Sequence, residues 1–421
     1  MGDVKDGATR AAAEAATRVA RESYGKLVAF LSARSRDVAG AEDALSDAFA
    51  AALKEWPMSG LPNNPAGWLV VAARRRLADA ARRRQSAEAA GDDLRLIDDE
   101  LREAAEGQGE GETIPDRRLA LMFACAHPAI EASIRAPLML QTVLGLDAAA
   151  IASAFLVAPA TMGQRLSRAK ARIRMAGVPF RIPERADLPE RLDAVLDAIY
   201  AAFSFGWGEA FGDSRGRDLA EEAIWLARVA ANLAPDQPEA LGLLALMLFA
   251  HARRAARRDD AGRYVPLGLQ DVALWDRQAI EEAEAILRRA AEFRAPGRFQ
   301  LEAAIQSAHA TRRVSGAVDW PAIAQLYDGL FALTLSPVVA VNRAVATAEA
   351  HGAQAGLALL AEVEAGGDLA EFQPFWAAKA DICARAGSVE EALEAYSRAA
   401  GLETDPAVRA FLMERRAALL H

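Results

Sequence analysis

The amino-acid sequence predicts an all-α fold, and three observations lead to this prediction. Alanine is abundant and aromatic residues make up only 6% of the chain, a composition that favours helices over sheets. Few segments are rich in valine, isoleucine, threonine or tyrosine, and none reads as a convincing strand. Apolar residues instead recur at helical spacing along most of the chain.

Length and charge narrow the class of protein. With 421 residues, of which 52% are hydrophobic and 25% charged, the chain is expected to form a soluble globular protein of about two to four domains. Its net charge of −9 argues, taken whole, against nucleic-acid binding, but basic clusters lie within residues 1–175. Local charge is the better guide to a nucleic-acid partner.

The sequence indicates neither export, nor membrane insertion, nor metal binding. The N-terminal sequence MGDVKDGATR lacks the apolar core of a signal peptide, and no apolar run could span a bilayer, so a cytoplasmic protein without a membrane partner is expected. Cys125 and Cys383 lie far apart in helical patterns, which disfavours a disulfide. The five histidines show no paired ligand spacing, and neither a metal nor another cofactor is expected.

Two helices are predicted at the start of the chain. The first runs from Ala8 to about Ser35, and the second from Val38 to Trp56. The second helix carries Glu42, Asp43 and Asp47 near its N-terminal half, where the helix dipole favours acidic side chains. Its apolar face is formed by Leu45, Ala48, Phe49 and Ala52.

A third, strongly basic helix is expected from Pro65 to about Arg84, with Asn64 as its cap. Against the single acid Asp79 it carries six arginines, namely Arg74, Arg75, Arg76, Arg82, Arg83 and Arg84. This density suits contact with a phosphate backbone. The alternative is a basic helix end that completes its own dipole, with Arg75 and Asp79 paired one turn apart.

Residues 138–174 have the pattern of a helix-turn-helix. Asp147 is suited to cap a first helix that buries Ile151, Ala154 and Phe155, and Pro159 fits the first position of a second helix. On the second helix one stripe is apolar, comprising Met162, Leu166, Ala169 and Ile173. The opposite face is polar and basic, comprising Thr161, Gln164, Arg165, Arg168 and Arg172. The alternative is an ordinary amphipathic helix with a solvated basic face.

An acidic segment separates these two basic regions. Nine acidic residues, two arginines and several glycines occupy residues 92–112, with few apolar residues to anchor a core. The segment is therefore interpreted as a flexible linker. Its acidity is compatible either with imitation of a nucleic acid or with a solubilising spacer.

The order of these pieces resembles a known family. AEDALSDAF followed by Trp56, then NPAGWL, AARRRLADAARRR and the helix-turn-helix, looks like regions 2 and 4 of an extracytoplasmic-function (ECF) sigma factor of the sigma-70 family, from about Ala8 to Pro183. FACAHPAI and AKARIRMAGVPFRIP are typical of a subgroup with a helical C-terminal extension. The family often has asparagine in the third helix where this chain reads Arg74, Arg75 and Arg76.

The resemblance implies partners and roles for particular residues. Core RNA polymerase would be bound through its β′ clamp helices and β flap, with Glu42, Asp43, Asp47 and Phe49 facing the clamp helices. Residues on the minus-ten side of promoter DNA would be Trp68, Arg74, Arg75, Asp79, Arg82 and Arg83. Residues at the upstream element would be Thr161, Gln164, Arg165, Arg168, Lys170 and Arg172.

From about Glu184 the sequence predicts helix pairs. FWAAKADICARAG followed by EEALEAYSRAAGLETDP places small residues where paired helices touch and a glycine turn between them, much like a tetratricopeptide (TPR) repeat. A TPR-like α-solenoid is therefore expected, with a concave face for a peptide, protein or small-molecule ligand. The predicted domains are region 2 (8–85), the linker (86–115), region 4 (116–183) and the solenoid (184–421).

Two stretches of the extension, VPLGLQDVALWD and APGRFQLEAAIQSAHA, have the pattern of ligand-contacting loops. The candidate regulatory residues are Arg298, Gln300, Glu302 and His309. The alternative is structural, a buried arginine–glutamate pair and a satisfied histidine between helices. No nucleophile, base and orienting group can be assembled from the sequence, so an enzyme is not expected.

Three functions are compatible with these patterns. The first is an alternative sigma factor that directs core polymerase to promoters and is regulated in cis by its TPR-like domain. The second is a helix-turn-helix regulator with a helical sensing domain and no sigma-type polymerase contact. The third is a helical scaffold whose basic faces are merely solvated. The acidic and basic helices of the first 85 residues favour the first function.

Overall fold

The computed structural model of the chain describes residues 2–87, 116–155, 157–184, 187–208, 214–366 and 369–420. Within these ranges the regular elements are helices, and the β-type pairing is confined to an isolated bridge between Arg258 and Tyr264. The predicted all-α class is confirmed. Residues 88–115, most of the predicted acidic linker, lie outside the described residues.

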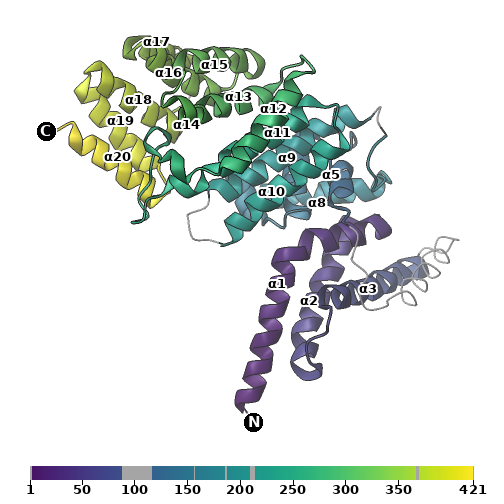
Figure 1. Ribbon diagram of the computed structural model, residues 1–421. Helices are drawn as coiled ribbons and strands as arrows, with labels where there is room; N and C mark the ends of the chain where they lie inside the picture. Colours follow the sequence, from purple (N-terminus) through teal and green to yellow (C-terminus); the bar gives the residue numbers. More distant parts are fainter. Residues whose placement is uncertain are drawn as a thin grey trace. The chain divides into compact units, whose positions relative to one another are not determined.

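The chain divides into two compact units, and the division falls between Ala223 and Ile224, within α10 (Ser214–Leu233). Figure 1 labels most of the helices and colours the chain from purple at the N-terminus to yellow at the C-terminus. None of the described helices combines the length and apolar character needed to cross a membrane.

The first unit begins with three helices close to the predicted bounds: α1 (Gly2–Ser35), α2 (Val38–Ser59) and α3 (Pro65–Ala87). Asp37 caps α2 by accepting the Gly40 N–H at 3.0 Å. Asn64 caps α3 by accepting the Gly67 N–H at 2.9 Å, as predicted. The three helices pack on one another. The core residues that they bury include Leu27, Leu31, Leu45, Trp56 and Leu69.

Four shorter helices follow: α5 (Arg118–Cys125), α6 (Ala132–Thr142), α7 (Ala148–Ala154) and α8 (Pro159–Met175). Asp147 caps α7 through the Ala150 N–H at 2.8 Å, and Pro159 is the first residue of α8. The predicted stripe of Met162, Leu166, Ala169 and Ile173 is buried.

The prediction for one apolar residue of this region was wrong. Phe155 lies just beyond the end of α7 and is 36% exposed. It leaves the helical register before its side chain can join Ile151 on the buried face.

The first unit continues past the predicted boundary at residue 183. Helix α9 (Leu188–Gly208) packs against α5 and α6. The apolar face that it buries includes Leu192, Val195, Leu196 and Ile199. Because an amphipathic helix is stabilised mainly by packing of this kind, α9 belongs to the core of the first unit.

Helix α1 also approaches the end of α6 closely. A Cβ atom built on Gly25 would lie 1.7 Å from the Val143 carbonyl oxygen, so only glycine fits at this contact. The Tyr24 ring lies beside Gly145, which has a φ of 67°. The first three helices and α6 therefore meet through backbone as well as side chains.

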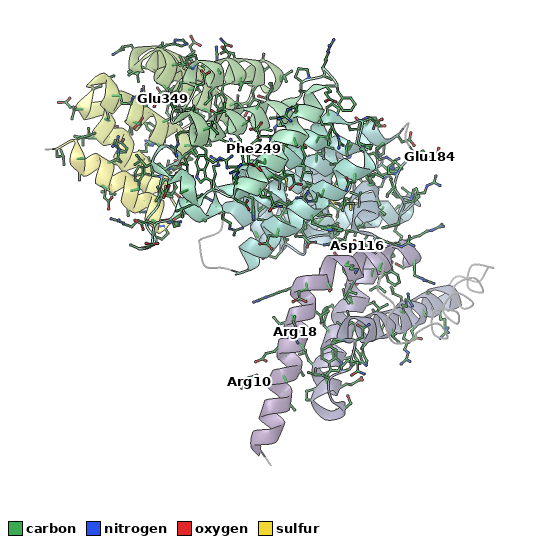
Figure 2. All side chains as sticks on the ribbon, viewed as in Figure 1. Arg10, Arg18, Asp116, Glu184, Phe249 and Glu349 are labelled. Atoms are coloured by element: carbon green, nitrogen blue, oxygen red, sulfur yellow. The ribbon has the colours of Figure 1, made fainter. Side chains whose placement is uncertain are left out.

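The second unit is a succession of packed helices that bury residues such as Phe249, labelled in Figure 2. After α10 they are α11 (Pro238–Ala252), α12 (Arg277–Ala291), α13 (Arg298–Ala310), α14 (Arg312–Ser315), α15 (Trp320–Thr334), α16 (Pro337–His351), α17 (Ala353–Gly366), α18 (Gln373–Ala386), α19 (Val389–Leu402) and α20 (Pro406–Ala418). Short 3-10 helices between α11 and α12 are η1 (Arg254–Arg257), η2 (Leu267–Leu269) and η3 (Val272–Leu274).

The best-defined helix pair of the second unit is α18 and α19. Gly387 ends α18 in the left-handed conformation, with a φ of 81°, and so supplies the glycine turn expected from the sequence. Ala380, Ala395 and Ala399 are buried where the two helices touch. Small residues at this contact allow the helices to approach closely.

Candidate nucleic-acid interface

Helix α8 presents one polar and basic face. Thr161, Gln164, Arg168 and Arg172 are exposed, and α8 contains no acidic residue. Cations and amide groups on the outer face of a helix are the side chains that contact phosphates and base edges in a major groove.

Arg165 on the same helix is more restrained. Its guanidinium donates to the Ser133 hydroxyl at 2.6 Å and lies 3.4 Å from a Glu131 carboxylate oxygen. The hydrogen bond from Ser133 and the charge of Arg165 lower the pKa of the Glu131 carboxyl. A shallow groove of about 460 Å³, lined by Glu131, Arg165, Arg168 and Arg172, follows this edge of α8. Arg165 is therefore held in place by Ser133 and Glu131. Arg168, which also lines the groove, donates instead to the Gln164 carbonyl of its own helix at 3.4 Å.

The basic helix α3 divides its arginines between solvent and core. Arg75 and Arg76 are exposed, and Arg82 lies 3.4 Å from Asp79 in an ion pair. The side chain of Arg83 lies outside the described residues.

Arg74 behaves differently from its neighbours. Its guanidinium lies over the Phe30 ring, 4.8 Å from the ring centroid. Burial, with the nearby charge of Arg34, lowers the pKa of Arg74. The half-buried Arg74 thus covers the core of the first three helices, while Arg75 and Arg76 face outward.

A groove of about 670 Å³ lies between α2 and α3. One wall is acidic, with Asp43, Asp47 and Glu55 from α2. The other wall combines cations with an aromatic ring, and its residues include Trp68, Arg75, Arg76 and Asp79 from α3. Arg76 donates to the Asp47 carboxylate at 2.8 Å and links the two walls.

Two of the residues predicted on these helices are more buried. Trp68 is half-buried and packs edge-on against the buried Trp56, with ring centroids 5.5 Å apart. Phe49 of α2 is also half-buried. The exposed acids of α2 are Asp43, Asp47 and Glu55, while Glu42 is half-buried.

The structure brings together two predicted residues from different regions. Lys170 of α8 forms an ion pair with Glu42 of α2, and the two side chains are only 11% and 15% exposed. Arg174 reaches the Asp37 carboxylate at 3.2 Å. The family resemblance assigns Glu42 to the polymerase interface and Lys170 to the DNA interface. In the structure each of these side chains instead shields the other from solvent. Sequence reasoning missed this pair because 128 residues separate its members.

Burial dominates the electrostatics of Glu42. It raises the pKa of the carboxyl above its usual range, even though the charge and hydrogen bond of Lys170 act in the opposite direction. Burial of this ion pair therefore carries a large desolvation cost.

The four candidate regulatory residues of the C-terminal extension lie on α13 but have different contacts. Arg298 and Glu302 form an ion pair at 2.8 Å along α13. The Gln300 amide donates to Glu239 at 3.2 Å and to the Ala295 carbonyl at 2.8 Å. His309 packs edge-on against Trp320, with ring centroids 5.4 Å apart.

Glu239 of α11 is a residue that sequence reasoning missed. Its carboxylate accepts the backbone N–H groups of Phe299 and Gln300 at 2.8 and 3.1 Å. It therefore caps α13 from another helix. A Cβ on Gly297 would lie 2.2 Å from the Glu239 Cδ atom, so the close approach of Glu239 requires glycine at position 297. This glycine is the one signal of the contact in the sequence.

Comparison with known proteins identifies part of the chain. Residues 19–87 match the family model for sigma-70 region 2, so the chain carries a sigma-70 region 2 domain, which supports membership of the sigma-70 family of transcription initiation factors. An uncharacterized protein of Rhizobium meliloti (strain 1021) is 39% identical over 375 residues, which cover 88% of each chain. The present chain belongs to the same family as that protein.

The second half of the chain is less informative in these comparisons. Residues 191–291 match a family of unknown function (DUF6596), a range that includes α11 and the loop after it. No solved structure matches the chain.

We predict that removal of Lys170 alone destabilises the first unit. In Lys170→Met the Glu42 carboxylate stays buried without its partner, which should cost about 3 to 5 kcal/mol in the free energy of unfolding. The double variant Glu42→Gln with Lys170→Met should recover most of that loss, because no buried charge remains. Urea unfolding followed by tryptophan fluorescence measures both.

Arg172→Gln provides the control, because Arg172 lies on the same helix and is exposed. It should change the free energy of unfolding by less than about 1 kcal/mol. A Lys170→Met variant as stable as the wild type would show that the buried pair does not constrain the first unit.

Proposed function

We propose that this protein is an ECF-type sigma factor that binds core RNA polymerase and directs it to specific promoters. The observation that carries the proposal is the groove between α2 and α3, which lies within the region 2 match and has an acidic and a basic wall. An acidic patch is suited to contact a basic partner surface, and a row of arginines is suited to a phosphate backbone.

In this proposal the two walls have different partners. Asp43 and Asp47 on α2 face the β′ clamp helices of the polymerase, while Arg75 and Arg82 on α3 face the minus-ten side of the promoter. Helix α8 is the recognition helix for the upstream element, with Gln164 and Arg168 among its exposed residues. Region 4 would also contact the β flap.

The buried pair of Glu42 and Lys170 adds a condition. Neither side chain can reach polymerase or DNA while they contact each other at 15% and 11% exposure. We propose that binding to polymerase separates α2 from α8.

Charge reversal on α2 tests the polymerase contact. Asp43→Lys with Asp47→Lys should reduce affinity for core polymerase and promoter-dependent transcription in vitro by at least tenfold, because acids that face a basic surface become cations. Both positions are exposed, so stability should change by about 1 kcal/mol or less even though the ion pair between Asp47 and Arg76 is lost. Competition for core polymerase against a labelled sigma factor measures the affinity.

The matched control is Glu362→Lys with Glu414→Lys, two exposed acids of the second unit. It makes the same change in net charge and should bind core polymerase normally. If both double variants bind as the wild type does, the assignment of α2 fails.

We further propose that the second unit is a TPR-like domain that regulates this activity in cis. Its succession of packed helices and the glycine turn between α18 and α19 support a repeat architecture. A ligand of that domain would bias transcription only by binding one state of the protein better than another.

Truncation of the chain tests whether the second unit regulates transcription, and the fold determines where the chain can be truncated. A chain that ends after Ala223 keeps α9 and the ion pair between Arg118 and Glu222, so the first unit should remain folded. Its promoter-dependent transcription should differ at least threefold from that of the full chain. A chain that ends after Pro183 loses α9, exposes the faces of α5 and α6 and should aggregate.

Unchanged transcription by a folded chain ending after Ala223 would contradict regulation in cis. Circular dichroism of each truncated chain separates that result from a simple loss of folding.

A further inference from the structure

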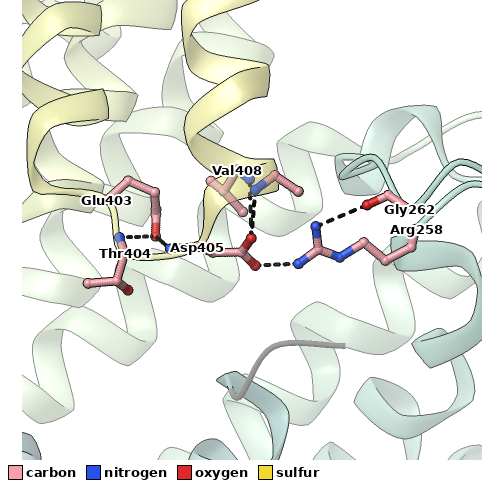
Figure 3. A network of polar contacts seen from close by, with 7 residues as sticks. Arg258, Gly262, Glu403, Thr404, Asp405 and Val408 are labelled. Atoms are coloured by element: carbon pink, nitrogen blue, oxygen red, sulfur yellow. Dashed lines mark hydrogen bonds and ion pairs between the residues drawn. The ribbon is translucent and has the colours of Figure 1, made fainter. Parts of the chain in front are cut away.

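The loop between α11 and α12 contains five arginines: Arg253, Arg254, Arg257, Arg258 and Arg263. Two of them are matched with carboxylates. Arg258 forms an ion pair with Asp405, which also accepts the Val408 N–H at the start of α20 (Figure 3). Arg263 pairs with Asp259 at 2.8 Å.

Arg253 and Arg312 have a different environment. Both guanidiniums lie against Trp275, at 6.0 and 5.2 Å from its ring centroid. Arg253 donates to the Phe249 carbonyl at 3.3 Å and to the Gln306 amide oxygen. Arg312 donates to carbonyls of the same loop, including Gly268 at 2.7 Å and Gln270 at 2.6 Å. Among the described residues, every hydrogen-bond partner of these two cations is neutral.

The cations of this cluster lie close enough together to lower the pKa values of their neighbours. Burial, followed by the charges of Arg257 and Arg312, lowers the pKa of Arg253 to about 10. Burial, followed by the charges of Arg253 and Arg312, lowers the pKa of His309 to about 4. No carboxylate of the described residues contributes to either shift. Buried cations are ordinarily paired with an anion, because an unpaired one is costly.

A neutral donor completes the cluster. Trp275 is 4% exposed, and its Nε1–H has no hydrogen-bond partner among the described residues. Arg253, His309 and Arg312 are only half-buried, so solvent can reach the charged side of the cluster. We define the Arg253 cluster as Arg253, Trp275, His309 and Arg312.

We propose that the Arg253 cluster binds a small molecule through a phosphate or carboxylate group. A guanidinium presents parallel N–H donors that match two oxygens of such a group. Arg253 and Arg312 would supply the charge, and Trp275 a neutral hydrogen bond. The site is built from the end of α11, the residue after η3, and the α13–α14 connection, and it includes His309 but not Arg298, Gln300 or Glu302. It does not depend on the proposed sigma activity.

Binding to the full chain tests this proposal without polymerase. Inorganic pyrophosphate and citrate are titrated separately by calorimetry at constant ionic strength, one probe for each kind of oxyanion. At least one should bind. Arg253→Gln should weaken that binding at least tenfold, whereas Arg263→Gln on the same loop and Arg168→Gln on α8 should retain it.

A second measurement uses the wild type and does not depend on whether Arg253→Gln folds. A bound anion beside His309 should move the NMR titration of its imidazole from about pH 4 towards higher pH, because the anion favours the imidazolium. Binding of either probe with this shift supports the site. The site is overturned if neither probe binds at millimolar concentration, if a probe binds without moving the His309 titration, or if folded Arg253→Gln binds as tightly as the wild type.

Discussion

The buried ion pair of Glu42 and Lys170 is the interaction on which the first unit depends most. Each side chain is removed from water, and the desolvation of Glu42 outweighs the attraction of Lys170 in setting its pKa. A pair of this kind does little for net stability, but its geometry specifies one arrangement, because any other leaves a charge buried alone. No side chain fits where Gly25 contacts the Val143 carbonyl, so this contact also restricts how α1 packs against the end of α6.

The same physical logic separates three groups of arginines in this protein. Arginines such as Arg76, Arg258 and Arg263 form ion pairs with carboxylates of the same chain, so a structural role explains their charge. Arg168 and Arg172 are exposed on α8, where a polyanion can reach them. Among the described residues Arg253 and Arg312 have no carboxylate partner, and neither is fully exposed, which is the state expected of a small-anion site.

Local signals in the sequence predicted the local structure well. The caps Asn64 and Asp147, Pro159 at the start of α8 and the buried stripe through Met162 each depend on residues within a few positions of one another. Features that depend on distant residues could not be found this way. Arg74 packs on Phe30 of another helix, and Glu239 caps a helix some 60 residues later. The inclusion of α9 in the first unit depends on its packing against α5 and α6, which the local sequence pattern around residue 183 does not show.

The central claim is that the outer face of α2 binds core RNA polymerase. Ser46 is exposed between Asp43 and Asp47, so a photoreactive amino acid placed there reports directly on what covers this face. After mixing the full chain with core polymerase, the account predicts a crosslink from position 46 to the β′ subunit and none from the same amino acid at position 362 in α17. A crosslink from position 362 with none from position 46 would contradict it.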